Sequence, residues 1–145
     1  MKRNRIRLSK HFWLSEFEDD CGWVMIHPSI IDSLETLWSL CAKEIGEDVE
    51  VIITGATLTA AAHYALGTRL GWTDGDPPGP VSRTSYHREE HGGVAVDFYV
   101  RNKRTKERLP QRLVGFKAIG CFNFVKDDYA DGHIHGDNRM CSEAD

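Results

Sequence analysis

The most constraining feature of the sequence is the helical spacing of apolar residues between Pro28 and Gly46. Apolar side chains recur there every three or four positions, at Ile30, Ile31, Leu34, Leu37, Trp38 and Cys41. This is the pattern of a helix with one buried face. Proline suits the first turn of a helix and glycine suits its end. We therefore expect a helix from Pro28 to Gly46, the most strongly specified element of the chain.

Short apolar runs elsewhere predict strands. Val49, Val51 and Ile53 form a β-branched run that ends at Thr54-Gly55, which is typical of a strand with one buried face. The other expected elements are an Ala-rich helix at 58–66, a Gly- and Pro-rich loop at 67–82, strands at 94–100 and 120–125, a helical turn from Pro110, and a short strand around Ile134. Their irregular order, without a repeating βαβ rhythm, predicts an α+β domain with a small antiparallel sheet flanked by helices.

Length and composition exclude several classes of protein. The chain has 145 residues, of which 41% are hydrophobic and 28% charged, so we expect residues 1–145 to form a single globular domain. The net charge of −4 and the lack of a long basic stripe argue against nucleic-acid binding. No apolar run is long enough for a membrane span or a signal peptide, which predicts a protein that is cytoplasmic as synthesised.

Histidine and aspartate gather in two segments with the spacing of metal ligands. The first runs from Ser85-Tyr86-His87 through a glycine turn at Gly92-Gly93 to Asp97, and the second is His133-Ile134-His135. Histidines two apart on a strand project from the same face. One of them could therefore complete a three-ligand zinc site that keeps a fourth position open, as catalytic zinc sites do.

Together these segments resemble a known family of zinc peptidases. The patterns Ser-x-His, Gly-x-Ala-x-Asp and His-x-His-x-Asp-x-Arg resemble those of D-alanyl-D-alanine carboxypeptidases and phage L-alanyl-D-glutamate endopeptidases. The opening segment at 8–17 and the segment 115–120 resemble the same family, so the resemblance covers most of the chain. It implies the fold shared by these peptidases and the hedgehog amino-terminal domain.

The resemblance implies a metal site with one zinc ion held by His87, Asp97 and His135. Five residues separate His87 from Gly93, where family members usually have two. His91 is therefore a rival first ligand, although His87 keeps the Ser-x-His context. The resemblance also implies that His133 is the proton-transferring residue, with Asp131 as the reserve.

The segment that binds substrate in the family has a different sequence in this chain. Where the family has Ser-Gly-x-Arg, with an arginine that binds a substrate carboxylate, this chain has Thr54-Gly55-Ala56-Thr57. Arg69 or Arg83 could replace that arginine, since a guanidinium matches a carboxylate in two places. Candidate substrate-binding residues are Arg83, Ser85 and Arg139. Ser85 and Asp137 are also expected to orient imidazoles or substrate, and Arg139 to pair with a carboxylate of the protein or the substrate.

The function implied is zinc-dependent hydrolysis of peptide bonds in peptidoglycan, with its stem peptides as partners. A chain without a signal peptide would fit a phage-encoded enzyme that is released to the cell wall. The alternative is a non-catalytic zinc domain that binds wall fragments or another protein, which the missing arginine favours. A third possibility is a structural domain without metal.

Overall fold

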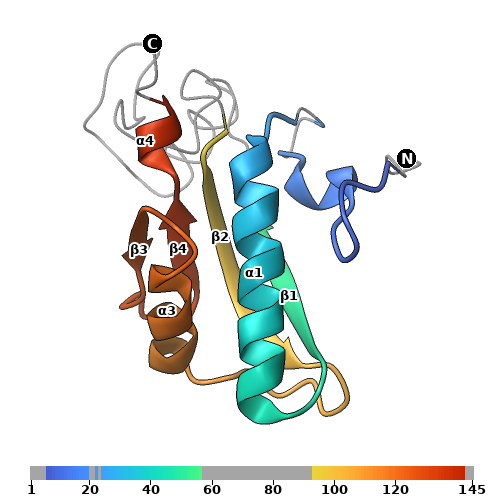
Figure 1. The fold of residues 1–145 in the computed structure, drawn as a ribbon, viewed down its shortest axis with the longest axis vertical. Helices are drawn as coiled ribbons and strands as arrows, with labels where there is room; N and C mark the ends of the chain where they lie inside the picture. Colours follow the sequence, from blue (N-terminus) through green and yellow to red (C-terminus); the bar gives the residue numbers. More distant parts are fainter. Residues whose placement is uncertain (1–5, 20–21, 23, 57–92, 143–145) are drawn as a thin grey trace.

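The computed structural model of the protein describes residues 6–19, 22, 24–56 and 93–142. Four antiparallel strands form one sheet in the order β1-β2-β4-β3 (Figure 1). The strands are β1 Val49–Gly55, β2 Ala95–Asn102, β3 Phe124–Lys126 and β4 Ile134–Asp137. The helices are η1 Leu14–Phe17, α1 Pro28–Ile45, α3 Gln111–Ile119 and α4 Arg139–Ser142. The predicted α+β class and the small antiparallel sheet are confirmed.

Helix α1 has the ends that its sequence predicts. The ring of His27 accepts a hydrogen bond from the Ser29 N–H at the first turn, and Pro28 follows this N-cap directly. Gly46 ends the helix in the left-handed conformation and donates its N–H to the Ala42 carbonyl. The predicted helix from Pro28 to Gly46 is therefore confirmed.

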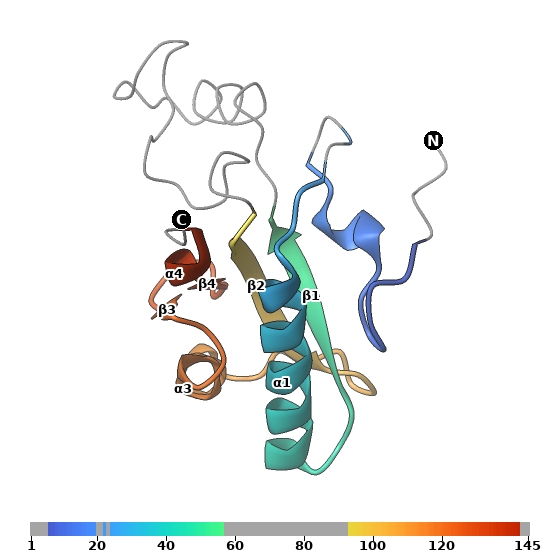
Figure 2. The same cartoon turned by 45° about the horizontal axis from the view of Figure 1, so that its top comes forward.

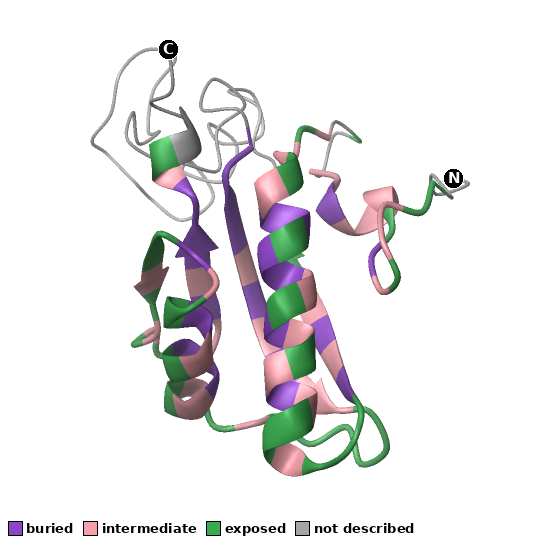
Figure 3. Cartoon of the chain, in the orientation of Figure 1, coloured by how far each residue is buried: buried purple, intermediate pink, exposed green. Residues whose placement is uncertain are grey.

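Helices α1 and α3 cover one face of the sheet and form the core with it (Figures 1 and 2). In β2 the buried Val96, Phe98 and Val100 alternate with less buried residues, and Ala95 at the start of the strand is buried as well. Figure 3 shows buried residues recurring along α1 among more exposed ones, and the apolar residues among them belong to the core. Burial of each large side chain contributes about 1.5–3 kcal/mol, so this face of the sheet carries most of the stability.

One predicted strand is shorter than expected. The sequence predicts a strand at 120–125, but only Phe124 and Val125 of this run belong to β3. Gly120, Cys121 and Phe122 form the turn that ends α3, where the N–H groups of Cys121 and Phe122 bond to the Ala118 carbonyl. The apolar character of this run has another cause, because Phe122 is buried and its ring lies 5.9 Å from that of Phe98.

The remaining predicted elements are either confirmed or lie outside the described residues. Strands expected at 49–55, at 94–100 and around Ile134 are confirmed as β1, β2 and β4, and the helical turn from Pro110 as α3. The helix predicted at 58–66 and the loop predicted at 67–82 lie outside the described residues. Within the described part of the chain, no helix is both long and apolar enough to cross a membrane.

The N-terminal segment packs along α1. Phe12 and Phe17 are fully buried, and the Glu35 carboxylate of α1 accepts hydrogen bonds from the Ser9 hydroxyl and from the His11 backbone N–H. The His11 imidazole contacts the second oxygen of Glu35 at 2.6 Å and stacks on Trp38. One carboxylate thus holds three groups of this segment.

A glycine fixes the entry into β2. Gly93 has a φ of 68°, and its carbonyl accepts the His27 N–H. A Cβ at this position would lie 2.0 Å from the Met25 carbonyl oxygen. Both the left-handed backbone and the close approach require glycine, which gives a physical reason for the first residue of the Gly-x-Ala-x-Asp pattern.

Candidate active site

The pairing of β2 with β4 brings two predicted metal ligands together. Asp97 and His135 are direct partners in the antiparallel register, so their side chains lie on the same face of the sheet. This is the face opposite the helices, because the neighbouring residues Val96 and Phe98 are in the core. The Nδ1 atom of His135 lies 3.0 Å from Oδ1 of Asp97.

The end of β1 also lies beside Asp97. The register between β1 and β2 shifts between Ile53 and Gly55, so that Gly55 lies opposite Asp97. A Cβ on Gly55 would be 3.4 Å from Asp97 Oδ2. Three of the four strands therefore meet around this carboxylate.

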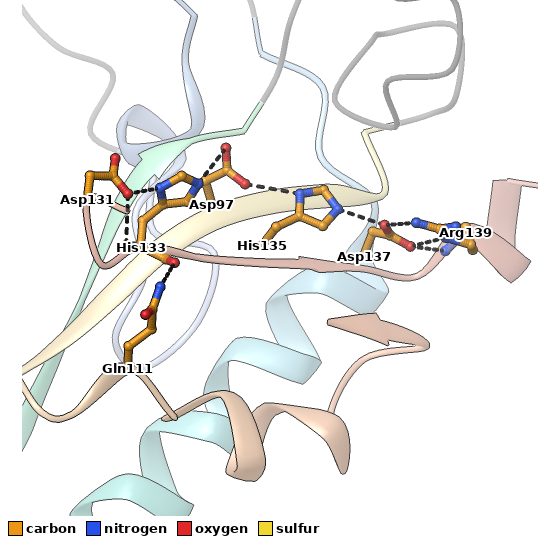
Figure 4. Close-up of polar contacts among 7 residues, drawn as sticks. All are labelled: Asp97, Gln111, Asp131, His133, His135, Asp137 and Arg139. Atoms are coloured by element: carbon orange, nitrogen blue, oxygen red, sulfur yellow. Dashed lines mark hydrogen bonds and ion pairs between the residues drawn. The ribbon is translucent and has the colours of Figure 1, made fainter. Parts of the chain in front are cut away.

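His133 approaches Asp97 from the other side (Figure 4). It directly precedes β4, and its Nε2 lies 3.9 Å from Asp97 Oδ2. Its Nδ1 is held by Asp131 Oδ1, which also accepts the His133 backbone N–H. Its ring stacks on Tyr129 with a centroid separation of 3.9 Å. The predicted common face for the two histidines is confirmed, since both reach the same carboxylate.

Asp137 supports His135 from behind. Its carboxylate is completely buried, and Oδ2 lies 2.7 Å from Nε2 of His135. Arg139 grips the same carboxylate with two hydrogen bonds, Nε to Oδ1 and a terminal nitrogen to Oδ2, both 2.8 Å. Its guanidinium also lies 3.9 Å above the Phe124 ring. Of the two roles considered for Arg139, pairing with a protein carboxylate is the one seen.

The carboxylates on either side set the protonation of His135. Burial lowers the pKa of this imidazole, but the hydrogen bonds to Asp137 and Asp97 and their negative charges raise it to about 9. Burial raises the pKa of Asp137, whereas the hydrogen bonds and charges of Arg139 and His135 lower it to about 2. Without a metal, His135 is thus positively charged at neutral pH, and Asp137 is ionised.

The contacts of the His135 ring with Asp97 and Asp137 also fit a metal ion, which would take the place of the proton between His135 Nδ1 and Asp97 Oδ1. When the ring carries its proton on Nε2 and hydrogen-bonds through it to Asp137, Nδ1 has a free lone pair beside Asp97. In many metal sites a carboxylate orients a metal-binding histidine in this way. Two ligand atoms about 2.0 Å from one tetrahedral zinc ion lie about 3.3 Å apart, close to the 3.0 Å observed here. Imidazole nitrogen and carboxylate oxygen are both common zinc ligands.

The remaining predicted residues divide into two groups. Asp131, His133, Asp97, His135, Asp137 and Arg139 form one continuous row of alternating acidic and basic groups (Figure 4). Among the described residues no three His, Cys, Asp or Glu side chains are grouped as metal ligands. The third predicted ligand and the remaining candidates lie outside the described residues: His87, its rival His91, Arg69, Arg83 and Ser85.

Three residues near His133 were not predicted. The side-chain amide of Gln111, at the start of α3, donates to the carbonyls of both Tyr129 and His133. Tyr129 stacks on the His133 ring, and Arg108 donates to the Asp131 carbonyl. A tyrosine within an otherwise polar turn is a weak sequence signal of such stacking. Nothing in the local sequence marks Gln111 or Arg108.

Comparison with protein-family models, with curated proteins and with solved structures gives no match to this chain.

Proposed function

We propose that the protein is a zinc-dependent peptidase that hydrolyses peptide bonds in bacterial peptidoglycan. The observation that carries the proposal is the position of Asp97 between His133 and His135 on the sheet face opposite α1 and α3. The Asp97 carboxylate and the His135 imidazole supply two metal ligands, and the nearby His133 imidazole supplies a group that can transfer a proton.

Asp97 and His135 would hold the zinc ion, with His87 as the third ligand. A bound zinc ion supplies a Lewis acid that polarises a carbonyl group and lowers the pKa of water. The role of Asp137 is to keep the His135 proton on Nε2, so that Nδ1 faces Asp97 as a lone-pair donor. Arg139 keeps Asp137 ionised and in place.

His133 is the group best placed to protonate the leaving amine. Its Nδ1 is occupied by Asp131, and its Nε2 points to Asp97. The proton that moves is therefore on Nε2. Hydrogen bonds from the backbone and the imidazole of His133 lower the pKa of Asp131, which makes Asp131 an acceptor that orients His133. A positioned acid of this kind contributes about 10²–10⁴-fold to the rate.

The choice of substrate is supported by the sequence pattern. The segments around His87, Asp97 and His135 resemble those of wall-peptide hydrolases, in the same order and over most of the chain. Peptidoglycan stem peptides, which are short and carry free carboxylates, are therefore the proposed substrates.

The test is mass spectrometry of purified peptidoglycan after incubation with the zinc-loaded protein. We expect new peptide termini that disappear with a chelator and with His135→Ala, and that fall by about 10²-fold or more with His133→Ala. Asp128→Asn is the matched control, because Asp128 is an exposed carboxylate that pairs only with Lys126 among the described residues.

The outcome also separates peptidase from binding module. Intact peptides in the presence of protein with bound zinc would contradict the peptidase and favour a zinc domain that binds wall fragments. Cleavage that persists in His135→Ala would contradict the assignment of this residue.

A further inference from the structure

Arg108 lies beside the candidate site at the point where the chain returns from the turn that follows β2. The residue forms an antiparallel bridge with Arg101, and the next residue, Leu109, donates its N–H to the Val100 carbonyl. The Arg108 guanidinium lies 3.8 Å above the ring of Tyr99. One terminal nitrogen donates to the Asp131 carbonyl at 3.1 Å.

These two contacts fix the guanidinium on the His133 side of the site. Tyr99 is two residues beyond Asp97 in β2 and therefore projects from the same face of the sheet. Asp131 is the residue that holds the His133 imidazole. Arg108 thus contacts one neighbour of Asp97 and one partner of His133.

The Arg108 side chain has no carboxylate partner among the described residues, whereas three other arginines of this part of the chain have one. Arg101 pairs with Glu50, Arg104 with Glu47 and Arg139 with Asp137. A guanidinium has five N–H donors, and Arg108 uses one of them in the contacts seen here. The residue is exposed, so its remaining donors are accessible to a ligand.

A fixed and accessible guanidinium is suited to a carboxylate. It binds both oxygens through parallel hydrogen bonds, and stacking on an aromatic ring reduces the freedom lost on binding. We propose that Arg108 binds a carboxylate of the substrate next to His133, so that the site prefers peptides with a free carboxylate at this position. The inference rests on the proposed function, because it concerns the substrate of the same site.

The test compares three acetylated tripeptides by calorimetric titration. The first, N-acetyl-L-alanyl-D-alanyl-D-alanine, has a terminal carboxylate; the second is its C-terminal amide; the third is an amide with D-glutamate at its last position, which has only a side-chain carboxylate. Titrations use the full chain with zinc and again with a chelator, since the chelated sample reads binding without turnover.

We expect at least one carboxylate peptide to bind the chelated protein about 10-fold or more tightly than the neutral amide. Comparison of the peptide that has a terminal carboxylate with the peptide that has a side-chain carboxylate then identifies which kind of carboxylate the site binds. Arg108→Gln should abolish the preference, because glutamine can still donate to the Asp131 carbonyl but has no charge. Arg104→Gln, in the same turn and paired with Glu47, should keep it.

Equal binding of charged and neutral peptides, including no binding by any of them, would overturn the proposal. So would a preference that survives in Arg108→Gln. The proposed function fails differently, through the absence of cleavage products in the zinc-containing samples while the Arg108-dependent preference remains in the chelated ones.

Discussion

At the scale of single residues, the candidate site depends on how Asp137 is held. This carboxylate is completely buried between the His135 imidazole and the Arg139 guanidinium. A buried carboxylate is costly unless each oxygen has partners, and both oxygens have them here. Asp137 can therefore remain ionised and fix the orientation of the His135 ring.

Asp137→Asn should weaken zinc binding. Asparagine keeps the shape of the side chain but removes the negative charge that holds the Nε2 proton of His135. Loss of such a partner typically lowers metal affinity by about 10–100-fold. Competition with a chromogenic chelator measures the affinity, with Asp128→Asn as the control. An unchanged zinc affinity would show that Asp137 does not act through His135.

The glycine before β2 gives a second prediction at this scale. Gly93→Ala should destabilise the protein by about 3 kcal/mol, because an L-residue in the left-handed region costs about 1–2 kcal/mol and the clash with Met25 adds a comparable amount. Gly46 has a nearly identical φ of 69°, but a Cβ there would meet nothing within 4 Å. Gly46→Ala should therefore cost only about 1–2 kcal/mol, the cost of the left-handed backbone. Urea unfolding of both variants gives the comparison, and equal losses would refute the steric argument.

At the scale of elements, the docking of the N-terminal segment on α1 depends on Glu35. Burial raises the pKa of this carboxyl, but the hydrogen bonds from Ser9 and His11 lower it by more, so that the pKa lies below its usual value of 4.5. A depressed pKa means that the ionised form is stabilised by folding. This contribution is complete above pH 4.5 and is lost as the pH falls through the folded-state pKa.

Glu35→Gln should therefore destabilise the protein by about 1.5–3 kcal/mol at pH 7, the range for hydrogen bonds to a charged group. The difference from the unmodified protein should shrink as the pH is lowered below 4.5. Urea unfolding between pH 3 and pH 7 measures both effects, with Glu107→Gln as an exposed control. A difference that stays constant with pH would contradict the role of the ionised carboxylate.

The elements that the sequence predicts well are those with a strong local pattern. Helix α1 has apolar spacing with a proline at its start and a glycine at its end, and β2 has an alternating run. The strand predicted at 120–125 was too long, because the burial of Phe122 against Phe98 follows from tertiary packing and not from alternation. A short apolar run looks the same in either case.

In the candidate site, too, some residues follow from a local sequence pattern and others only from tertiary packing. Asp97, His133 and His135 were predictable, because their types and spacing are those of a metal site and their alternation places them on one face. The position of Arg108 beside the site was not predictable, since this residue lies in a highly charged turn where arginines usually have no specific role. Only the return of the chain beside β2 places it over Tyr99.

At the scale of the whole molecule, the two faces of the sheet have separate roles. The face covered by α1 and α3 contains the core, whereas the opposite face of β2 and β4 carries the row from Asp131 to Arg139. A substitution in the exposed part of this row removes little apolar burial. Activity and stability should therefore be separable by mutation, which makes the site testable in folded protein.

The proposed function requires a zinc site centred on Asp97 and His135. The most direct test is the zinc content of the full chain after dialysis against buffered zinc, measured by plasma mass spectrometry for the unmodified protein, His135→Ala and the control Asp128→Asn. We expect one zinc ion per chain in the unmodified protein and the control, and none in His135→Ala. An unmodified chain that takes up no zinc, or a His135→Ala variant that keeps it, would rule out this zinc site.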